Sequence, residues 1–269
     1  GLNEYGLASY KTTNNFAQKE VEWLLSIGGI EVRTGQQLGR DITLDSLLDA
    51  FDAVFLGLGL QGVNALGVAE PTATGLRNAV DFIAELRQSP DLSTLPVGRR
   101  VVVIGGGMTA VDAAVQSRKL GAEEVTIVYR RGAEAMSASA VEQQWAQTNG
   151  VTIRHWAAPK EVLSENGAVK GVRFAATALS SGKLVETGET FTLDADMVLK
   201  AIGQTFVAEP VGNRIALEGG RIATDAEGQT SLARVWAGGD CRVGGRDLTV
   251  EAVEHGKVAA VSIHAALMA

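Results

Sequence analysis

Three consecutive glycines near the middle of the chain follow an apolar, β-branched run. Residues 101–104 read Val-Val-Val-Ile, and Gly105, Gly107 and Ala110 then form a G-x-G-x-x-A pattern ahead of an Ala-rich stretch at 111–120. Gly105 permits a sharp turn, Gly107 lets the backbone approach a pyrophosphate, and Ala110 keeps the helix close to the strand. The start of the helix presents free N–H groups to phosphate oxygens. The order of strand, glycine turn and helix therefore predicts a dinucleotide-binding βαβ unit.

The next apolar strand ends in two arginines. Residues 125–128 read Val-Thr-Ile-Val, and Arg130 and Arg131 follow at the distance from Gly105 where a site for NAD would carry Asp or Glu. A guanidinium suits the 2′-phosphate of NADP, because its planar fork pairs with two phosphate oxygens at once. The pattern therefore indicates NADP(H) as the cofactor. The alternative is an ordinary α/β turn with two surface arginines.

A second candidate site lies near the C-terminus, where the apolar run Val235–Ala237 leads into Gly238, Gly239 and Asp240. A strand that ends in Gly-Gly-Asp places a carboxylate at the carboxyl edge of a sheet, where α/β folds bind ligands. Asp240 can accept a hydrogen bond from a sugar-like hydroxyl. A helix expected from about Thr249 would direct its N–H groups at a group that becomes anionic, such as the pyrimidine end of a reduced flavin. The alternative is a strand, a turn and a helix capped by Asp240 or Thr249.

Another glycine pattern, Gly57–Gly62, also fits G-x-G-x-x-G after a predicted strand at 53–56. The residues after it are interrupted by Gly67 and Pro71, and no strand with a ribose-binding acid follows at the expected distance. We interpret this segment as a strand-end turn near a cofactor. An independent pyrophosphate loop is the alternative.

No catalytic or metal-binding side chain is predicted. Cys241 is the only cysteine, which excludes a disulfide, a C-x-x-C pair and a cysteine-ligated cluster within this chain. No partner base that would activate Cys241 as a nucleophile is evident. The three histidines, His155, His255 and His264, show no ligand spacing, and His255 is expected to face solvent.

Periodicity and end signals predict the elements that position these residues. Helices are expected at 18–27, 43–50, 79–88, 111–120 and 139–148, and from about 249 onward. Strands are expected at 30–33, 53–56, 101–104, 125–128, 151–156 and 196–201. A β meander is expected in three segments, at 161–163, 169–177 and 183–193, with its hairpin signal at Asn166-Gly167.

Composition narrows the class of protein. The chain has 269 residues, 46% of them hydrophobic, and a formal net charge of −7. Its length favours two domains. The acidic balance argues against nucleic-acid binding, and no apolar run reaches the ~18 residues of a membrane span. These features favour a cytoplasmic α/β enzyme that acts on small molecules.

The two candidate sites resemble those of a known group of flavoproteins. Residues 230–240, Thr-x4-Val-Trp-Ala-Gly-Gly-Asp, resemble the second flavin motif of flavoproteins with two dinucleotide-binding domains. Three further segments resemble parts of dihydropyrimidine dehydrogenases and of the related glutamate synthase small subunit, namely 128–131, 136–138 and 248–257. The N-terminal residues resemble the G-I-P-x-F/Y-R-L-P loop of this family, with departures at Ala8 and with Lys11 in the position of Arg.

The resemblance implies an α/β fold of the two-dinucleotide-binding flavoprotein type, in which a Rossmann-like NADP domain is inserted in a partial FAD domain. It divides the chain into a first FAD-domain segment at 1–95, an NAD(P)-binding domain at 96–203 and a C-terminal FAD-domain segment at 204–269. The family's cysteine-rich iron–sulfur domain and first flavin motif have no counterpart here, so we expect a fragment that purifies with little FAD. Thioredoxin reductase shares the architecture, but its nucleotide domain carries a C-x-x-C pair that this chain lacks.

The resemblance also implies a function. It suggests an NADPH-dependent flavin oxidoreductase module that binds NADP(H) and FAD and passes electrons to an iron–sulfur domain or a partner catalytic subunit. The cofactors carry the chemistry, so hydride transfer requires no side-chain acid or base. The alternative is a non-catalytic dinucleotide-binding module with a degenerate or truncated flavin site. The residues expected to hold the cofactors lie at strand ends or helix starts: Gly105, Gly106, Gly107, Met108, Thr109, Arg130, Arg131, Ala201, Gly203, Gly239, Asp240, Thr249 and Val250.

Overall fold

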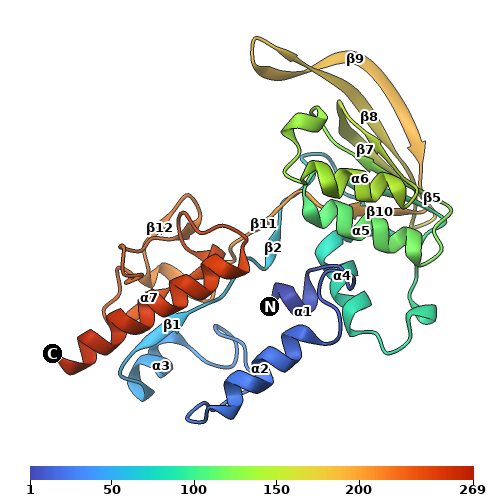
Figure 1. Ribbon diagram of the computed structural model, residues 1–269. Coiled ribbons are helices and arrows are strands. Elements are labelled where there is room, and N and C mark those ends of the chain that lie inside the picture. Colours follow the sequence, from blue (N-terminus) through green and yellow to red (C-terminus); the bar gives the residue numbers. More distant parts are fainter. The chain divides into compact units, whose positions relative to one another are not determined.

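The computed structural model describes residues 1–269, which fold into two compact units (Figure 1). The first unit comprises residues 1–26 and 63–203, and the second comprises residues 27–62 and 204–269. The chain therefore crosses between the units more than once. At two of these crossings lie the short strands β2 (Gly62–Val63) and β11 (Gln204–Thr205), which pair with each other.

The two units differ from the domain segments expected from the sequence. Of the expected first segment, 1–95, only residues 27–62 lie in the second unit. The parts on either side belong to the first unit, because α1 (Leu2–Tyr5) packs on α4 (Ala79–Gln88), and α4 packs on α5 (Met108–Lys119).

A five-stranded parallel sheet forms the centre of the first unit, with the order β3-β10-β4-β5-β6. Its strands are β3 (Leu76–Asn78), β10 (Met197–Lys200), β4 (Arg100–Ile104), β5 (Glu124–Val128) and β6 (Val151–Arg154). The central strand β4 is buried from Val101 to Ile104, which explains its unbroken apolar sequence. The strands predicted in this unit at 101–104, 125–128, 151–156 and 196–201 are confirmed.

Helices cover one face of this sheet (Figure 1). They are α4, α5 and α6 (Ala140–Thr148), and α5 contacts both of the others. Ser139 caps α6 through a reciprocal capping box with Glu142, as the sequence Ser-x-x-Glu suggests. The helices and the sheet share a core whose largest members are fully buried: Phe82, Ile83, Val101, Val103, Val111, Val115, Ile127 and Leu199. The predicted helices of this unit at 79–88, 111–120 and 139–148 are confirmed.

A three-stranded antiparallel meander covers the other face. It consists of β7 (Ala157–Glu165), β8 (Ala168–Ser180) and β9 (Lys183–Asp194), all longer than the predicted segments. The hairpin between β7 and β8 turns at Asn166 and Gly167, both with positive φ, as the sequence signal requires. Phe174 of β8 packs against Val102 and Val128 of the sheet.

The N-terminal residues are held on the first unit by two buried side chains. The carboxylate of Asp112, in α5, accepts hydrogen bonds from the Ala8 N–H and the Tyr10 hydroxyl, both at 3.1 Å, and pairs with Lys11 Nζ at 2.8 Å. Arg87 of α4 donates to three backbone carbonyls of the same N-terminal stretch. Helix α1 and the irregular backbone after it are thus fixed by polar contacts.

Replacement of Asp112 should therefore destabilise the first unit. Asp112→Ala leaves the Ala8 N–H unpaired and a half-buried Lys11 with only one of its two carboxylate partners, which we expect to lower the free energy of unfolding by about 3 kcal/mol in urea denaturation. Glu142→Ala removes the other, more exposed partner of Lys11, as well as half of the α6 capping box, and should cost only about 1 kcal/mol. Equal losses in the two variants would contradict this role of Asp112.

The second unit is built on a parallel pair of strands, β1 (Val54–Leu56) and β14 (Val235–Ala237). The long helix α7 (Thr249–Met268) packs on β14, and α3 (Leu44–Ala50) starts at the capping residue Thr43. Smaller elements complete this unit: β12 (Leu217–Glu218), β13 (Arg221–Ile222), η3 (Gly212–Arg214) and η4 (Gly239–Cys241). In the first unit the remaining elements are α2 (Phe16–Ser26), η1 (Leu92–Thr94) and η2 (Ala133–Ala135).

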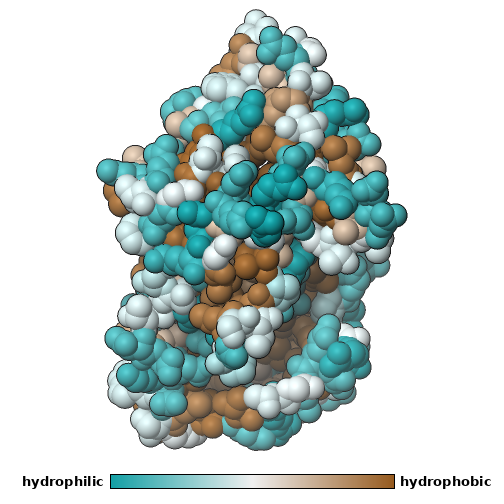
Figure 2. Space-filling view, turned by 90° about the vertical axis from the view of Figure 1, so that its right-hand side faces the viewer, coloured by the Kyte–Doolittle hydropathy of each residue, from teal (hydrophilic) through white to brown (hydrophobic).

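The strand predicted at 30–33 does not form. Ile30 and Val32 are exposed, and no strand lies alongside to pair with them, so the β-branched residues alone do not produce a strand. Hydrophobic residues also reach the surface elsewhere, and Figure 2 shows them among hydrophilic residues on one face. Among the exposed ones are Trp23 of α2 and Val250 and Val253 of α7. No helix is both long and apolar enough to cross a membrane.

Candidate functional site

The glycine turn (Gly105–Gly107) lies at the carboxyl end of β4. Gly105 has φ +151°, and a Cβ there would overlap the carbonyl oxygen of Ala201. The Gly105 N–H donates to the Val128 carbonyl at 3.0 Å, and the Ala201 N–H donates to the Ile104 carbonyl at 2.8 Å. The turn is therefore locked between the ends of β5 and β10, and only glycine fits at its first position.

Gly107 has a different environment, because its φ of −100° is accessible to any residue. A Cβ at Gly107 would meet only Ser137 Oγ, at 3.1 Å. Gly107 is the N-cap of α5, and no side chain caps the first turn, which contains Met108 and Thr109. Free N–H groups and the positive end of the helix dipole thus lie beside an open backbone, which is the arrangement that binds a phosphate.

The aromatic ring of Tyr129 covers Gly106. A Cβ at Gly106 would overlap this ring, and the Tyr129 hydroxyl donates to the Ala135 carbonyl at 2.7 Å. The Ala138 N–H in turn donates to the Gly106 carbonyl at 3.1 Å. Sequence reasoning assigned Tyr129 and Ser137 no role, although both lie in segments that carried the family resemblance.

The arginine pair (Arg130 and Arg131) follows β5 at the same edge of the sheet as the glycine turn. Both side chains are exposed, and no carboxylate pairs with either. Arg154, at the end of the neighbouring strand β6, also lacks an acidic partner, and its guanidinium lies over the Phe191 ring. Unpaired arginines at one sheet edge concentrate positive charge there, and such charge favours the binding of an anion such as a phosphate.

The end of β10 brings two more of the predicted residues to this edge. Ala201 contacts Gly105, and Gly203, with φ +92°, accepts a hydrogen bond from the Asn64 N–H at 3.1 Å. Lys200 forms an ion pair with Glu70, whose carboxylate also accepts from the Leu66 N–H. Burial raises the pKa of Glu70, but the hydrogen bonds from Lys200 and Leu66 outweigh it and hold this pKa below its ordinary value.

The Glu70–Lys200 pair should make stability depend on pH. Because the folded pKa of Glu70 is lowered, its contribution is present above the unfolded pKa of about 4.3 and is lost as the pH falls through the folded pKa. Glu70→Gln should therefore cost about 1 kcal/mol at pH 7 and less at pH 3, measured by denaturant unfolding. Glu31→Gln, which breaks the exposed pair with Arg33, should have no measurable effect at either pH. A loss at Glu70→Gln that is independent of pH would contradict the assignment.

In the second unit, the aspartate turn (Gly238–Asp240) follows β14. The parallel pairing of β1 and β14 brings the end of β1 beside it, and a Cβ at Gly59 would lie 3.7 Å from Asp240 Oδ1. The Asp240 carboxylate accepts no hydrogen bond within the chain, so it remains available to a ligand hydroxyl. No helix follows Gly57–Gly62, which agrees with the interpretation of this segment as a strand-end turn.

His255 contributes to the aspartate turn, so the expectation that it faces solvent is wrong. Its Nδ1 accepts a hydrogen bond from the Gly239 N–H at 3.1 Å, and only 16% of its side chain is exposed. Gly238 is required because a Cβ there would press on the Phe55 ring and on Cβ of His255. The only sequence signal for this contact is the position of His255 in the helix predicted from about 249 onward. The structure shows that this helix packs against β14.

Helix α7 begins beside the aspartate turn. Leu248, its N-cap, makes no side-chain cap, and Val250 in the first turn is exposed. Glu251 pairs with Arg246 at 2.7 Å, which neutralises the acid in this turn. Helix α7 starts at Thr249, as the sequence predicted.

Cys241 is fully buried, and its Sγ donates to the Gly238 carbonyl at 3.1 Å. Burial raises the pKa of this thiol, which disfavours the thiolate. The Cys241 side chain is therefore part of the core of the second unit, which agrees with the expectation that Cys241 is not a nucleophile.

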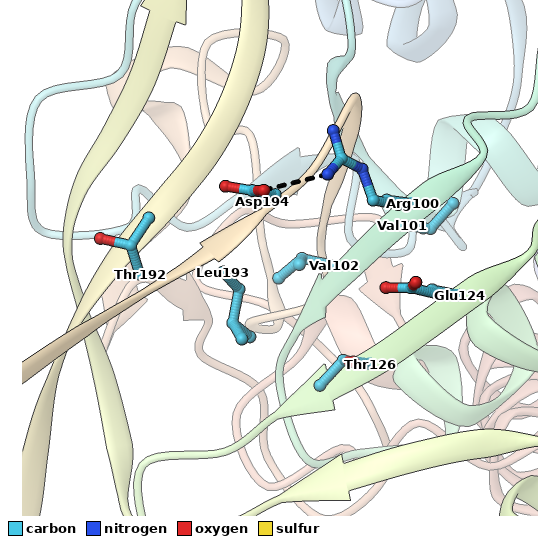
Figure 3. Close-up of a pocket in the computed structure, with 8 residues that line it drawn as sticks. All are labelled: Arg100, Val101, Val102, Glu124, Thr126, Thr192, Leu193 and Asp194. Atoms are coloured by element: carbon cyan, nitrogen blue, oxygen red, sulfur yellow. Dashed lines mark hydrogen bonds and ion pairs between the residues drawn. The ribbon is translucent and has the colours of Figure 1, made fainter.

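A cavity of 390 Å³ lies at the opposite edge of the first unit's sheet, near the amino ends of β4 and β5 (Figure 3). Its Arg100 and Asp194 pair with each other at 3.0 Å, while Val102 and Leu193 form apolar walls. Parallel sheets bind ligands at their carboxyl edge. The cavity is therefore separate from the candidate site.

Comparisons with known proteins identify the family that this chain resembles. A family model described as pyridine nucleotide-disulphide oxidoreductase matches residues 4–256. The NADP(+)-dependent formate dehydrogenase subunit beta of Moorella thermoacetica is 33% identical over 276 residues, covering 98% of this chain and 38% of that protein. The glutamate synthase (NADPH) small chain of Escherichia coli is 32% identical over 292 residues, covering 98% of this chain and 60% of that protein. The chain thus spans about two to three fifths of the length of these relatives.

Among solved structures, the oxidoreductase FprA of Mycobacterium tuberculosis matches with a TM-score of 0.78 at 19% identity, over 99% of this chain and 75% of that one. This match confirms the predicted α/β fold of the two-dinucleotide-binding flavoprotein type. The family match confirms the predicted resemblance to pyridine-nucleotide oxidoreductases.

Proposed function

Because this chain belongs to the pyridine nucleotide-disulphide oxidoreductase family, we propose that it takes up electrons from NADPH, with bound FAD as the hydride acceptor. The first unit would hold NADPH, and the second unit would hold the isoalloxazine and ribityl end of FAD. The observation that carries the proposal is the arginine pair, which lies unpaired and exposed at the same sheet edge as an uncapped glycine turn.

The residues of the first unit fit NADPH. A side chain at Gly107 would fill the space beside the uncapped start of α5, which is the space that a pyrophosphate needs. The arginine pair suits the 2′-phosphate. The residues that we propose to contact NADPH are Gly105, Gly106, Gly107, Met108, Thr109, Arg130, Arg131, Ala201 and Gly203.

The second unit fits part of FAD. Asp240 has a free carboxylate beside the close backbone approach at Gly59, and the first turn of α7 has no side-chain cap. We propose that Gly239, Asp240, Thr249 and Val250 contact the flavin and its ribityl chain. His255 would act indirectly, since it fixes the Gly239 backbone from behind.

When bound, the two cofactors supply hydride transfer from the nicotinamide to the isoalloxazine. The chain's own residues bind and orient. The glycine turn would hold the pyrophosphate of NADPH and the arginine pair its 2′-phosphate, and the start of α7 would favour negative charge on the flavin. No residue of the site needs to give or take a proton for this step.

The names of the two relatives indicate where the electrons would go next. The two relatives are named as subunits or chains of larger enzymes. We propose that this protein likewise delivers electrons to an iron–sulfur domain or to a partner catalytic subunit, in the cytoplasm.

The test is a flavin spectrum together with NADPH-dependent reduction of an artificial electron acceptor by the full-length protein. The proposal requires bound FAD and turnover with NADPH. The second candidate function is a non-catalytic dinucleotide-binding module. It is favoured by one observation, that the second unit contains no strand, glycine turn and helix in succession for the FAD pyrophosphate. Tight NADPH binding without flavin and without turnover would support that candidate.

A further inference from the structure

The backbone carbonyls of the arginine pair and of the preceding Tyr129 are all satisfied from the meander side. The Tyr129 carbonyl accepts from the Ala157 N–H at 3.1 Å, and the Arg131 carbonyl accepts from the Trp156 N–H at 3.2 Å. The Arg130 carbonyl accepts from the Thr177 hydroxyl at 2.8 Å. Three consecutive carbonyls are thus held, two of them by backbone groups and one by a side chain.

Thr177 is placed for this contact by an irregularity in β8. The pairing of β8 with β9 shifts register between Ala175 and Thr177, and Thr177 lies just past the last pair that joins β8 to β7. Its N–H donates to the Trp156 carbonyl at 2.9 Å, while its hydroxyl reaches Arg130. Only 6% of Thr177 is exposed, which makes it one of the few buried polar residues of the chain.

The backbone of Trp156 also holds the arginine pair. Its φ is +58°, in the left-handed region that a bulky residue rarely adopts. This conformation lets its N–H reach Arg131 while its carbonyl receives the Thr177 N–H. The backbone of the arginine pair, Trp156 and Thr177 therefore form one closed hydrogen-bonded unit.

We propose that Thr177 is a positioning residue for nucleotide specificity. Its hydroxyl fixes the peptide that links the two arginines, so that both guanidinium groups are held ready for the 2′-phosphate. The meander, which lies outside the nucleotide-binding sheet, would thereby contribute to the choice of NADPH over NADH. This inference rests on the proposed function, because it assumes that the arginine pair reads the 2′-phosphate.

Loss of the Thr177 hydroxyl should affect the contacts to the 2′-phosphate and not those to the pyrophosphate. The glycine turn makes no hydrogen bond to Thr177, so contacts to the pyrophosphate, which NADPH and NADH share, should be unaffected. Loss of the Thr177 hydroxyl leaves the Arg130 carbonyl unpaired and frees the turn to shift. NADPH should bind less tightly, and NADH should bind as before.

The experiment measures the dissociation constants of NADPH and NADH by calorimetry for the 269-residue chain. Thr177→Val, which keeps the shape and removes the donor, should weaken NADPH binding about fivefold and leave NADH binding unchanged. Thr177→Ser, which restores the hydroxyl, should return the NADPH affinity to near the parental value. Thr190→Val, on the exposed part of β9, is the matched control and should change neither affinity. Thr177→Ala carries the same prediction as Thr177→Val if the latter does not fold.

The inference is overturned if the ratio of the two affinities is unchanged in the variants without the hydroxyl, if both nucleotides weaken equally, or if Thr177→Ser fails to restore NADPH binding. A parental chain that binds NADPH and NADH equally would instead contradict the proposed function. A parental preference that disappears in the Arg130→Ala, Arg131→Ala double variant but persists in Thr177→Val would leave the proposed function standing and remove only this inference.

Discussion

Gly107→Val is expected to abolish NADPH binding while the first unit keeps its fold. The backbone at Gly107 is in a conformation that any residue adopts, and a Cβ there meets only Ser137 Oγ. The branched side chain instead occupies the open space over the start of α5, where the pyrophosphate would lie. Calorimetry should show a loss of at least about 100-fold in affinity, or about 2.7 kcal/mol, with an unchanged circular dichroism spectrum.

The control is a double variant, Gly107→Val with Ser137→Ala, which removes the one neighbouring side-chain atom that the new side chain meets. NADPH binding should remain absent, since the lost space belongs to the ligand and not to Ser137. Gly105→Ala provides the contrast: its Cβ would overlap the Ala201 carbonyl, so it should lower the melting temperature of the unit itself. NADPH binding by Gly107→Val near the parental affinity would show that this turn does not hold the phosphates.

The second large effect is expected from the arginine pair. The Arg130→Ala, Arg131→Ala double variant should bind NADPH at least about tenfold more weakly and NADH equally well, because each charge-assisted hydrogen bond to the 2′-phosphate contributes roughly 1.5–3 kcal/mol. Calorimetry with both nucleotides measures this difference. The NADPH affinity of the parental chain should also fall with added salt more steeply than the NADH affinity.

Arg99→Ala is the matched control for charge. Arg99 is exposed, pairs with Glu123 and lies just before β4, at the amino edge of the sheet. It should alter neither affinity. Equal binding of NADPH and NADH by the parental chain, or an unchanged preference in the double variant, would refute the role of the arginine pair.

Local signals in the sequence predicted the glycine turn and its surroundings well. The unbroken apolar run before Gly105 is explained by a central strand that is buried on both faces. Asn166-Gly167 adopts the positive φ angles of a tight hairpin, as predicted, and the predicted helix at 139–148 begins with a capping box between Ser139 and Glu142. In the capping box and the hairpin, the determining interaction joins residues that are close in sequence.

Contacts between distant segments were the ones that sequence reasoning missed. Residues 1–26 belong to the same unit as the five-stranded sheet, and the buried carboxylate of Asp112, about a hundred positions away, holds Ala8 and Tyr10 there. His255 reaches Gly239 only because α7 folds back over β14. The strand expected at 30–33 is absent because a strand needs a partner, which periodicity does not reveal.

The most direct test of hydride transfer from NADPH to FAD is anaerobic rapid mixing of the flavin-loaded, full-length protein with one equivalent of NADPH, followed by the absorbance of the oxidised flavin. The account predicts that this absorbance disappears within one turnover in the parental protein, more slowly with NADH, and not at all in Gly107→Val. An absorbance that stays constant while calorimetry shows NADPH bound, or one that disappears equally fast in Gly107→Val, would contradict it.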